Sequence, residues 1–311
     1  MDTDAGGRLL ADLFGGVPAR AGDDLRRLFD ALPGLESSGQ EGDIEVTAVP
    51  LRVLHWVARP TIDAAGTRVG VTLTLQDVTH EREVTQMKSD FVGFVTHQLR
   101  TPLAGIKWLL ELAAEDPALP AEAKGYVAES RAAAERLISL VNDLLDISRL
   151  ESGQLGVTPV AVDLGALTRD ALDEAQGPIS AQGHVVSVTG AGRARADHQL
   201  FRQVVLNLVS NATKYTPPGG RITIRIDPAD GKVTWAITDT GIGIPLAARS
   251  HLFEKFYRAD NVQPLETEGT GLGLYLVRLI VDQLRGHIRY ESVEGEGTTF
   301  IVTLPAADGA Q

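Results

Sequence analysis

The chain has 311 residues, which is too long for one ordinary hydrophobic core and predicts two or three domains. Apolar residues make up 43% and charged residues 23%, a balance that excludes wholesale disorder. The net charge of −12 has the wrong sign for a general nucleic-acid binder. The absence of cysteine excludes disulfides, zinc–thiolate sites and cysteine nucleophiles. No apolar run approaches the roughly 20 residues of a membrane span, so we expect a cytoplasmic protein with no transmembrane segment in this chain.

Residues 1–79 predict a small antiparallel sheet. A short helix over 24–32 precedes three stretches that alternate apolar and polar side chains, which is typical of strands with one buried face. The stretches are Ile44–Ala48, Arg52–Arg59 and Arg68–Gln76, with a hairpin turn at Asp63–Gly66 between the last two. His55 and Trp56 could line a ligand pocket, but we interpret them as ordinary strand residues.

The middle of the chain predicts two long helices. A helix from about 80 to 115 carries an apolar stripe centred on Val95, and a second helix runs from Pro120 to Ser152-Gly153. The stripe consists of Val84, Phe91, Val95, Leu99, Ile106, Leu110 and Ala113. Helices joined by so short a loop form an antiparallel hairpin. Because one hairpin cannot bury both apolar stripes, we expect two copies to dimerise into a four-helix bundle.

From Val157 onward the pattern is mixed α/β. The expected helices are 163–175, with Asp163 as N-cap, 197–215 and 271–285. The expected strands are 184–188, 221–226, 233–239, 287–291 and 298–304, with a loop-rich stretch over 241–270.

His97 lies about 200° from Val95 on the helical wheel, on the face away from the apolar stripe. Its neighbours on that face, which include Asp90, Thr101 and Ala104, are small or polar. Pro102 cannot donate to the carbonyl of Gln98, so we expect the helix to bend there. Surface histidines are common, and this position alone says little about function.

The string around this histidine, FVTHQLRTPL from Phe94 to Leu103, resembles the phospho-acceptor box of sensor histidine kinases. The resemblance implies that an imidazole nitrogen of His97 attacks the γ-phosphate of ATP, and that Thr101 helps to dephosphorylate a partner. The attack requires an exposed neutral imidazole, which histidine supplies near neutral pH. The family normally has Glu or Asp after the histidine. Gln98 stands there instead, and a neutral amide orients the ring but cannot take its proton.

A second motif, VVLNLVSNATKYTPPGG, covers Val204–Gly220. It places Asn207, Asn211, Lys214 and Tyr215 on one helix face. Paired asparagines alone commonly cap a helix or are simply exposed to solvent. Two amides, a lysine and a tyrosine together are suited to phosphate and a metal ion. By resemblance to the kinase N-box, Asn211 is the Mg²⁺ ligand, Asn207 and Lys214 contact phosphates, and Tyr215 flanks the base.

Two glycine motifs follow, and each alone is a weak signal. Their residues are Asp239, Gly241 and Gly243 in the first, and Gly269, Thr270, Gly271, Leu272 and Gly273 in the second. Neither matches a dinucleotide-binding or Walker A loop. They resemble the ATP site shared by histidine kinases, gyrases and heat-shock chaperones. That resemblance implies that Asp239 accepts the adenine amino group, while the glycines allow close approach of base and phosphates.

Two further segments extend the resemblance to the kinase ATP site. Leu252–Arg258 is similar to the kinase F-box, where Lys255 and Arg258 supply positive charge against the triphosphate. Gly297–Phe300 is similar to the closing strand, with Thr299 near the adenine.

All of these motifs occur in the family's order, so the sequence predicts a multidomain α+β sensor histidine kinase. We expect a PAS-like antiparallel sensor segment at 1–79, a helical-hairpin dimerisation and phosphotransfer domain at 80–152, and an α/β-sandwich catalytic domain at 157–305. The expected cofactors are ATP and Mg²⁺, and the expected partners are a second copy and a response-regulator receiver domain. Two alternatives stay open: a phosphatase-biased or non-catalytic scaffold, favoured by Gln98, and an ATPase of the same fold without a phospho-acceptor.

Overall fold

The computed structural model describes residues 40–46, 52–64, 67–116, 118–259, 261 and 269–307. The chain divides between Lys88 and Ser89 into two compact units, each of which is described by itself below. The helix expected over 24–32 and residue Ala48 lie outside the described residues. None of the helices in the described part of the chain combines the length and the apolar composition that crossing a membrane requires.

The first unit contains the predicted antiparallel meander, with strand order β1(Gln40–Val46)-β2(Arg52–Ile62)-β3(Arg68–Asp77). Leu54 and Ala58 are buried on one face of β2, and Trp56 between them packs against Ala58. On the other face of β2, His55 bonds across the strand pair to Asp43, with Nδ1 2.7 Å from Oδ1. These contacts agree with the interpretation of His55 and Trp56 as strand residues.

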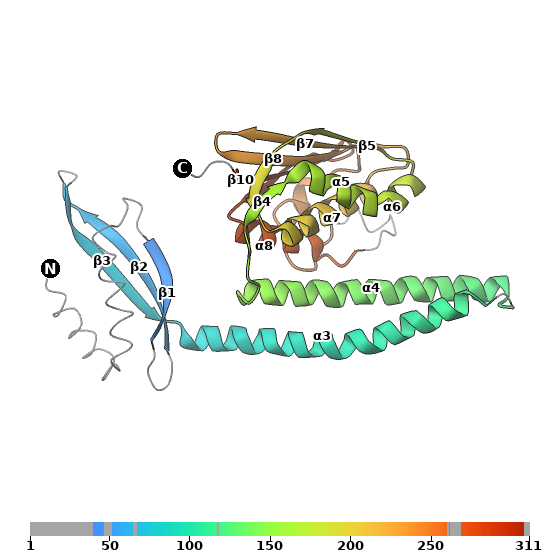
Figure 1. Cartoon of the computed structure of the whole chain (residues 1–311), viewed down its shortest axis with the longest axis horizontal. Coiled ribbons are helices and arrows are strands. Elements are labelled where there is room, and N and C mark those ends of the chain that lie inside the picture. Colours follow the sequence, from blue (N-terminus) through green and yellow to red (C-terminus); the bar gives the residue numbers. More distant parts are fainter. Residues whose placement is uncertain are drawn as a thin grey trace. The chain divides into compact units, whose positions relative to one another are not determined.

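The boundary between the units falls inside α3 (Thr79–Ala114), and from Ser89 onward this helix forms the predicted helical hairpin with α4 (Ala121–Glu151) (Figure 1). Pro102 lies inside α3, and α3 bends towards α4 over its C-terminal part. Ser89 and Thr96 are buried, whereas Phe91, Leu99 and Ile106 of the predicted stripe stay 42–69% exposed. Within a single chain the stripe therefore lacks a packing partner along these residues.

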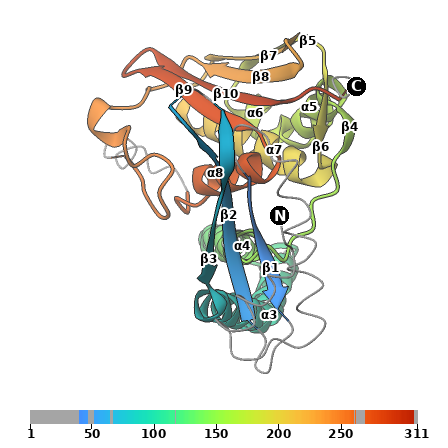
Figure 2. The ribbon, with the colours of Figure 1, turned by 90° about the vertical axis from the view of Figure 1, so that its left-hand side faces the viewer.

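The rest of the second unit is an α/β sandwich with a five-stranded sheet. The strand order is β5(Val185–Gly190)-β7(Arg221–Ala229)-β8(Lys232–Asp239)-β10(Gly297–Pro305)-β9(His287–Val293). Only β5 and β7 pair in parallel within this sheet, and its other neighbouring strands are antiparallel. Helices α5 (Leu164–Glu174), α6 (Gln176–Ala181), α7 (His198–Tyr215) and α8 (Gly273–Gln283) lie on one face of the sheet (Figures 1 and 2).

Four short elements of this sandwich were not predicted from the sequence. They are the paired strands β4 (Val160–Asp163) and β6 (Arg193–Ala196), helix α6, and the 3₁₀ turn Leu246–Ala248. None is longer than six residues, so none shows enough periods of an apolar pattern to be detected. Asp163 is the N-cap of α5 as predicted, with its Oδ1 accepting from the amide of Ala166 at 2.9 Å.

The sandwich core is organised around Trp235 of β8, whose side chain is completely buried. Its indole Nε1–H donates to Oγ1 of the equally buried Thr168 on α5 at 2.9 Å. Phe201 of α7 packs edge-on against the indole, with ring centroids 6.2 Å apart. One side chain of the sheet therefore fixes two of the helices that cover it.

We expect Thr168→Val to destabilise the sandwich by about 1–3 kcal/mol, because it leaves the indole N–H of Trp235 buried without an acceptor. In a Trp235→Phe background the same substitution should cost clearly less, since that donor is already gone. Urea unfolding of the four proteins in this cycle measures both values. An equal cost of Thr168→Val in the two backgrounds would contradict the assignment.

Candidate functional site

A cavity of about 710 Å³ opens between α4, α7, the loop after β8 and the start of α8. This volume is in the range of small-molecule sites. Eleven of the residues singled out from the sequence line it: Asn207, Asn211, Lys214, Tyr215, Asp239, Gly243, Arg258, Gly269, Thr270, Gly271 and Gly273. The fold thus gathers residues that are up to 66 positions apart in the chain.

Helix α7 presents the amide face of the cavity. Its N-terminus is fixed by Asp197, whose Oδ1 accepts from the amides of Gln199 and Leu200 at 3.0 and 3.2 Å. The opposite face of α7 is completely buried in the core, so the helix cannot turn its polar face elsewhere. Asn207 Nδ2 donates to the carbonyl of Gln203 at 3.0 Å, which commits its nitrogen and leaves the amide oxygen as an acceptor.

Asp239 ends β8 at the floor of the cavity and is only 8% exposed. Its Oδ1 accepts from the backbone amides of Gly241 at 2.8 Å and Thr298 at 3.3 Å. Burial is the main influence on this carboxyl and raises its pKa to about 6, although both hydrogen bonds act in the opposite direction. No described residue donates to Oδ2, so this oxygen is free to accept from a ligand in the cavity.

The glycines next to the cavity are required by the protein's own backbone. Gly243 has φ +67°, and a Cβ there would lie 2.1 Å from the carbonyl oxygen of Val293. Gly271 has φ +70°, and a Cβ there would lie 2.7 Å from the backbone of Phe256. The resemblance attributed these glycines to the approach of a ligand, whereas the structure shows that close packing already excludes a side chain.

Four residues predicted to bind the ligand do not line the cavity: Gly241, Lys255, Leu272 and Thr299. Leu272 is completely buried in the core. Thr299 points to the other face of the sheet and bonds to Thr238 at 3.0 Å, because side chains alternate along β10. Thr298, one position earlier, faces the cavity in its place.

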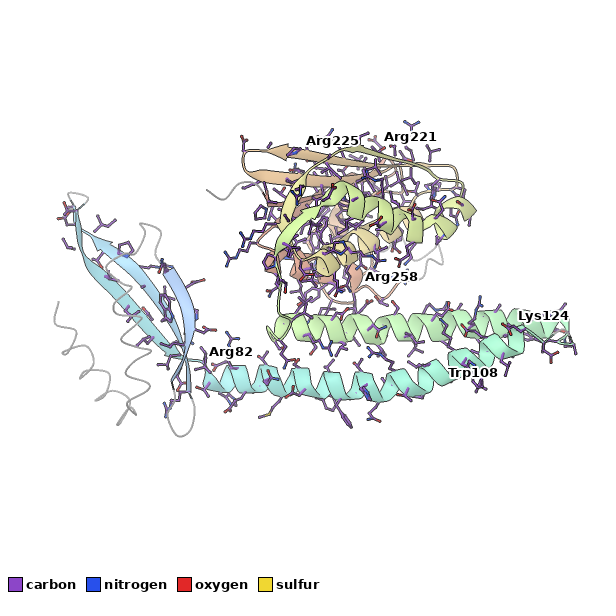
Figure 3. All side chains as sticks on the ribbon, viewed as in Figure 1. Arg82, Trp108, Lys124, Arg221, Arg225 and Arg258 are labelled. Atoms are coloured by element: carbon purple, nitrogen blue, oxygen red, sulfur yellow. The ribbon has the colours of Figure 1, made fainter. Side chains whose placement is uncertain are left out.

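Lys255 also differs from the prediction. Its ammonium pairs with Glu151 of α4, with Nζ 2.6 Å from Oε1, and lies 5.0 Å from the ring centre of Tyr275. It therefore fastens the sandwich to α4. Arg258, by contrast, lines the cavity and lies on the side of the sandwich that faces α4 (Figure 3).

Residues of α4 form one wall of the cavity, a contribution that was not predicted from the sequence. They include Arg136, Leu140 and Asp143. Thr270 Oγ1 donates to Asp143 Oδ2 at 3.4 Å. No motif marks these positions, because α4 follows a simple helical pattern and lies some 60 residues before the first nucleotide motif.

Charges at this wall influence one another. Burial raises the pKa of Asp143 to about 6, and the like charge of Asp146 adds to the effect, while the Thr270 hydrogen bond and Lys214 lower it. Lys214 as a whole residue is exposed, yet desolvation lowers the pKa of its ammonium and Arg258 lowers it further, whereas Asp143 raises it. Asp143 and Lys214 therefore favour each other's charged form.

His97 is exposed in the middle of α3, as its place on the wheel predicts, and Gln98 and Thr101 are exposed beside it. One turn further, Arg100 donates to Asn142 Oδ1 on α4 at 2.8 Å. This hydrogen bond joins the two helices of the hairpin next to the histidine. The cavity and the exposed imidazole belong to different elements of the same unit.

Comparison with known proteins assigns families to both regions. Residues 87–153 match the His Kinase A (phospho-acceptor) domain, and residues 196–308 match the family described as Histidine kinase-, DNA gyrase B-, and HSP90-like ATPase. Sensor protein SrrB of Staphylococcus aureus is 32% identical over 243 residues, 77% of this chain and 42% of that protein. Drug sensory protein A of Synechocystis is 36% identical over 249 residues, 74% of this chain and 37% of that protein.

Among solved structures, full-length ShkA in complex with AMPPNP matches with a TM-score of 0.59 and 29% identity. The match covers 71% of this chain and 47% of that one. The chain thus spans less than half the length of the relatives described here.

The buried carboxyl of Asp239 gives a test of the site's electrostatics. Because its pKa is raised from 3.8 to about 6, its ionisation costs folding free energy above pH 6, and this cost disappears below pH 3.8. Asp239→Asn keeps the acceptor oxygen and removes the charge. We expect it to stabilise the ligand-free protein by about 3 kcal/mol at pH 7.5 and by roughly half as much at pH 5.

Urea unfolding at the two pH values measures this difference. Asp173→Asn, on the exposed side of α5, is the matched control and should change stability by less than about 0.5 kcal/mol at either pH. A stabilisation by Asp239→Asn that does not grow with pH would contradict the assigned cause.

Proposed function

The chain belongs to the sensor histidine kinases, and we propose that it autophosphorylates on His97 with Mg-ATP and passes the phosphoryl group to an aspartate of a response regulator. The observation that carries the proposal is the pairing, in one unit, of an exposed imidazole on α3 with a cavity floored by a buried carboxylate and walled by an amide face. An ATPase without a phospho-acceptor would need the cavity but not the exposed imidazole.

Within the cavity we assign the adenine to Asp239, whose Oδ2 accepts the exocyclic amino group, with Tyr215 flanking the base. Asn207, Lys214 and Thr270 face the phosphates, and Arg258 adds positive charge. In a chain of net charge −12, this local cluster of cations lowers the repulsion that a triphosphate would otherwise meet. Gly241, Lys255, Leu272 and Thr299 do not line the cavity, so we assign them no contact with the nucleotide.

The residues present fit a magnesium ion held mainly by the nucleotide's phosphates. Mg²⁺ prefers oxygen ligands and binds through few protein groups when phosphates are available. Asn211 lines the cavity and offers an amide oxygen, and Asn207 offers a second because its nitrogen is committed to Gln203. Bound there, the ion would neutralise phosphate charge.

The transfer proceeds by positioning and charge neutralisation. Nε2 of neutral His97 attacks the γ-phosphorus, the P–N bond forms, and the bond to the β-phosphate oxygen breaks to release ADP. The Nδ1 proton of the phospho-imidazolium must leave. Gln98 can accept a hydrogen bond from Nδ1–H and orient the ring, but water has to take the proton.

We also propose that two copies form a four-helix bundle through α3 and α4. The exposed apolar stripe supports this, because Phe91, Leu99 and Ile106 would otherwise face water. The partition into a PAS-like sensor segment at 1–79, a phosphotransfer domain at 80–152 and a catalytic domain at 157–305 is part of the same proposal. So is a cytoplasmic location, since ATP is the phosphoryl donor.

The direct test is the His97→Ala variant incubated with ATP labelled at the γ-phosphate. We expect it to lose all acid-labile, base-stable label while keeping its affinity for ATP, because His97 does not line the cavity. His80→Ala is the matched control, as His80 is also exposed on α3 and should leave the labelling intact. Persistent labelling of His97→Ala at the wild-type level would refute the assignment.

A phosphatase-biased function is the second candidate, and the specific observation in its favour is Gln98 beside the exposed Thr101. Gln98→Glu restores a group that can take the Nδ1 proton, and we expect it to speed autophosphorylation by up to about 10²-fold. The initial rate of label incorporation at saturating ATP measures the effect. An unchanged or slower rate, combined with rapid dephosphorylation of a regulator, would favour the phosphatase instead.

A further inference from the structure

Helix α4 is docked on the sandwich along its C-terminal half. Ile147 and Leu150 are buried in the core that the sandwich helices share. Asp146 Oδ2 accepts from Gln203 Nε2 at 2.9 Å, and Glu151 bonds to both Lys255 and Tyr275. Figures 1 and 2 agree in placing α4 between α3 and the sandwich.

Asp143 is the carboxylate of this docked face that lines the cavity. Its carboxylate accepts from Thr270 at 3.4 Å and attracts the ammonium of Lys214. These two groups come from different elements, the loop before α8 and the end of α7, and both face the phosphates in the proposed function. The carboxylate is half-buried there, so water screens its charge only in part.

We propose that Asp143 competes with the phosphates of the nucleotide for Thr270 and Lys214, so that docked α4 lowers the cavity's affinity for phosphate-bearing ligands. A carboxylate and a phosphate are both anionic oxygen acceptors, and a single hydroxyl proton cannot serve both at once. Any phosphate that enters beside Asp143 also meets its negative charge. The proposal rests on the proposed function insofar as the ligand is a nucleotide.

The competition is reciprocal. If docked α4 weakens nucleotide binding, bound nucleotide must weaken the docking of α4 by the same factor. The contacts of Asp146 and Glu151 lie outside the cavity, so the nucleotide competes directly with only one part of the docked face and weakens the other contacts only through the docking as a whole. Asp143 is thus a specificity residue for the phosphate part of the ligand, and it acts from the helix next to the phospho-acceptor helix.

The test measures binding of ATP and of adenosine to the full chain by calorimetry. Asp143→Asn keeps the shape of the side chain and removes the charge, and we expect about tenfold tighter binding of ATP. Adenosine, which has no phosphate, should bind both proteins within about twofold of each other. Asp143→Ala is a second variant that should shift ATP affinity in the same direction.

Glu135→Gln is the matched control. Glu135 lies on α4, carries the same charge as Asp143 and does not line the cavity. Its Oε1 lies 3.6 Å from Nζ of Lys107 on α3. Its substitution should leave ATP affinity unchanged. Unchanged ATP affinity in both Asp143 variants overturns the proposal, as does an equal gain for adenosine. If neither ligand binds even the wild-type chain, the proposed function fails with it.

A second measurement follows the docking itself. Because the chain has no cysteine, a pair introduced at Asp146 and Gln203 gives a unique site for a short bismaleimide crosslinker. ATP should slow the crosslinking severalfold, and adding Asp143→Asn should remove most of that effect. An ATP effect of the same size with and without Asp143 contradicts the competition.

Discussion

Helix α4 is packed against two different neighbours at once, and the placement of both is tied to it. One side of this helix carries the buried Leu145, which lies next to Gly93 of α3, and another side, with Ile147 and Leu150, is buried in the sandwich core. A helix held on two sides transmits a shift of one neighbour to the other, because packed cores resist continuous deformation. The helix that carries His97 and the cavity are therefore connected through α4.

Electrostatics give this arrangement its sensitivity. The chain as a whole is acidic, whereas two cationic residues, Lys214 and Arg258, line the cavity. Two carboxyls also line it: Asp239 is buried and Asp143 is half-buried. Burial raises the pKa of both carboxyls to about 6, so the ionised form of each costs folding free energy when no ligand is bound. A ligand that donates to Asp239, or that displaces Asp143, relieves part of that cost.

The sequence predicted best where one local pattern determines the answer. Helix α7 lies within one residue of its expected bounds, because Asp197 caps it and one face is uniformly apolar. Its four polar residues come together in the cavity for the same reason. The three-stranded meander was predicted from its strict alternation and its turn residues.

The misses have a common physical origin, since each depends on contacts between distant segments. Thr299 was placed at the site where Thr298 lies, because a motif gives the strand but not which of its faces meets the ligand. Lys255 was assigned to a triphosphate, yet Glu151 of a different element neutralises it. Asp143 carries no motif, and only the docking of α4 brings it to Thr270.

These contacts also bear on how the proposed phosphoryl transfer would occur. Attack on the γ-phosphorus requires the imidazole nitrogen to come within about 3–3.5 Å of it. In the single chain α4 lies between α3 and the sandwich, so the nucleotide cavity faces α4 rather than the helix of His97 (Figures 1 and 2). In the proposed reaction, a nucleotide in the cavity would reach His97 of its own chain only after the sandwich had moved away from α4. The alternative is that the cavity serves His97 of a second copy. A nucleotide that weakens the hold of Asp143 would favour that departure, and binding of the phosphoryl donor would then also release the domain that delivers it.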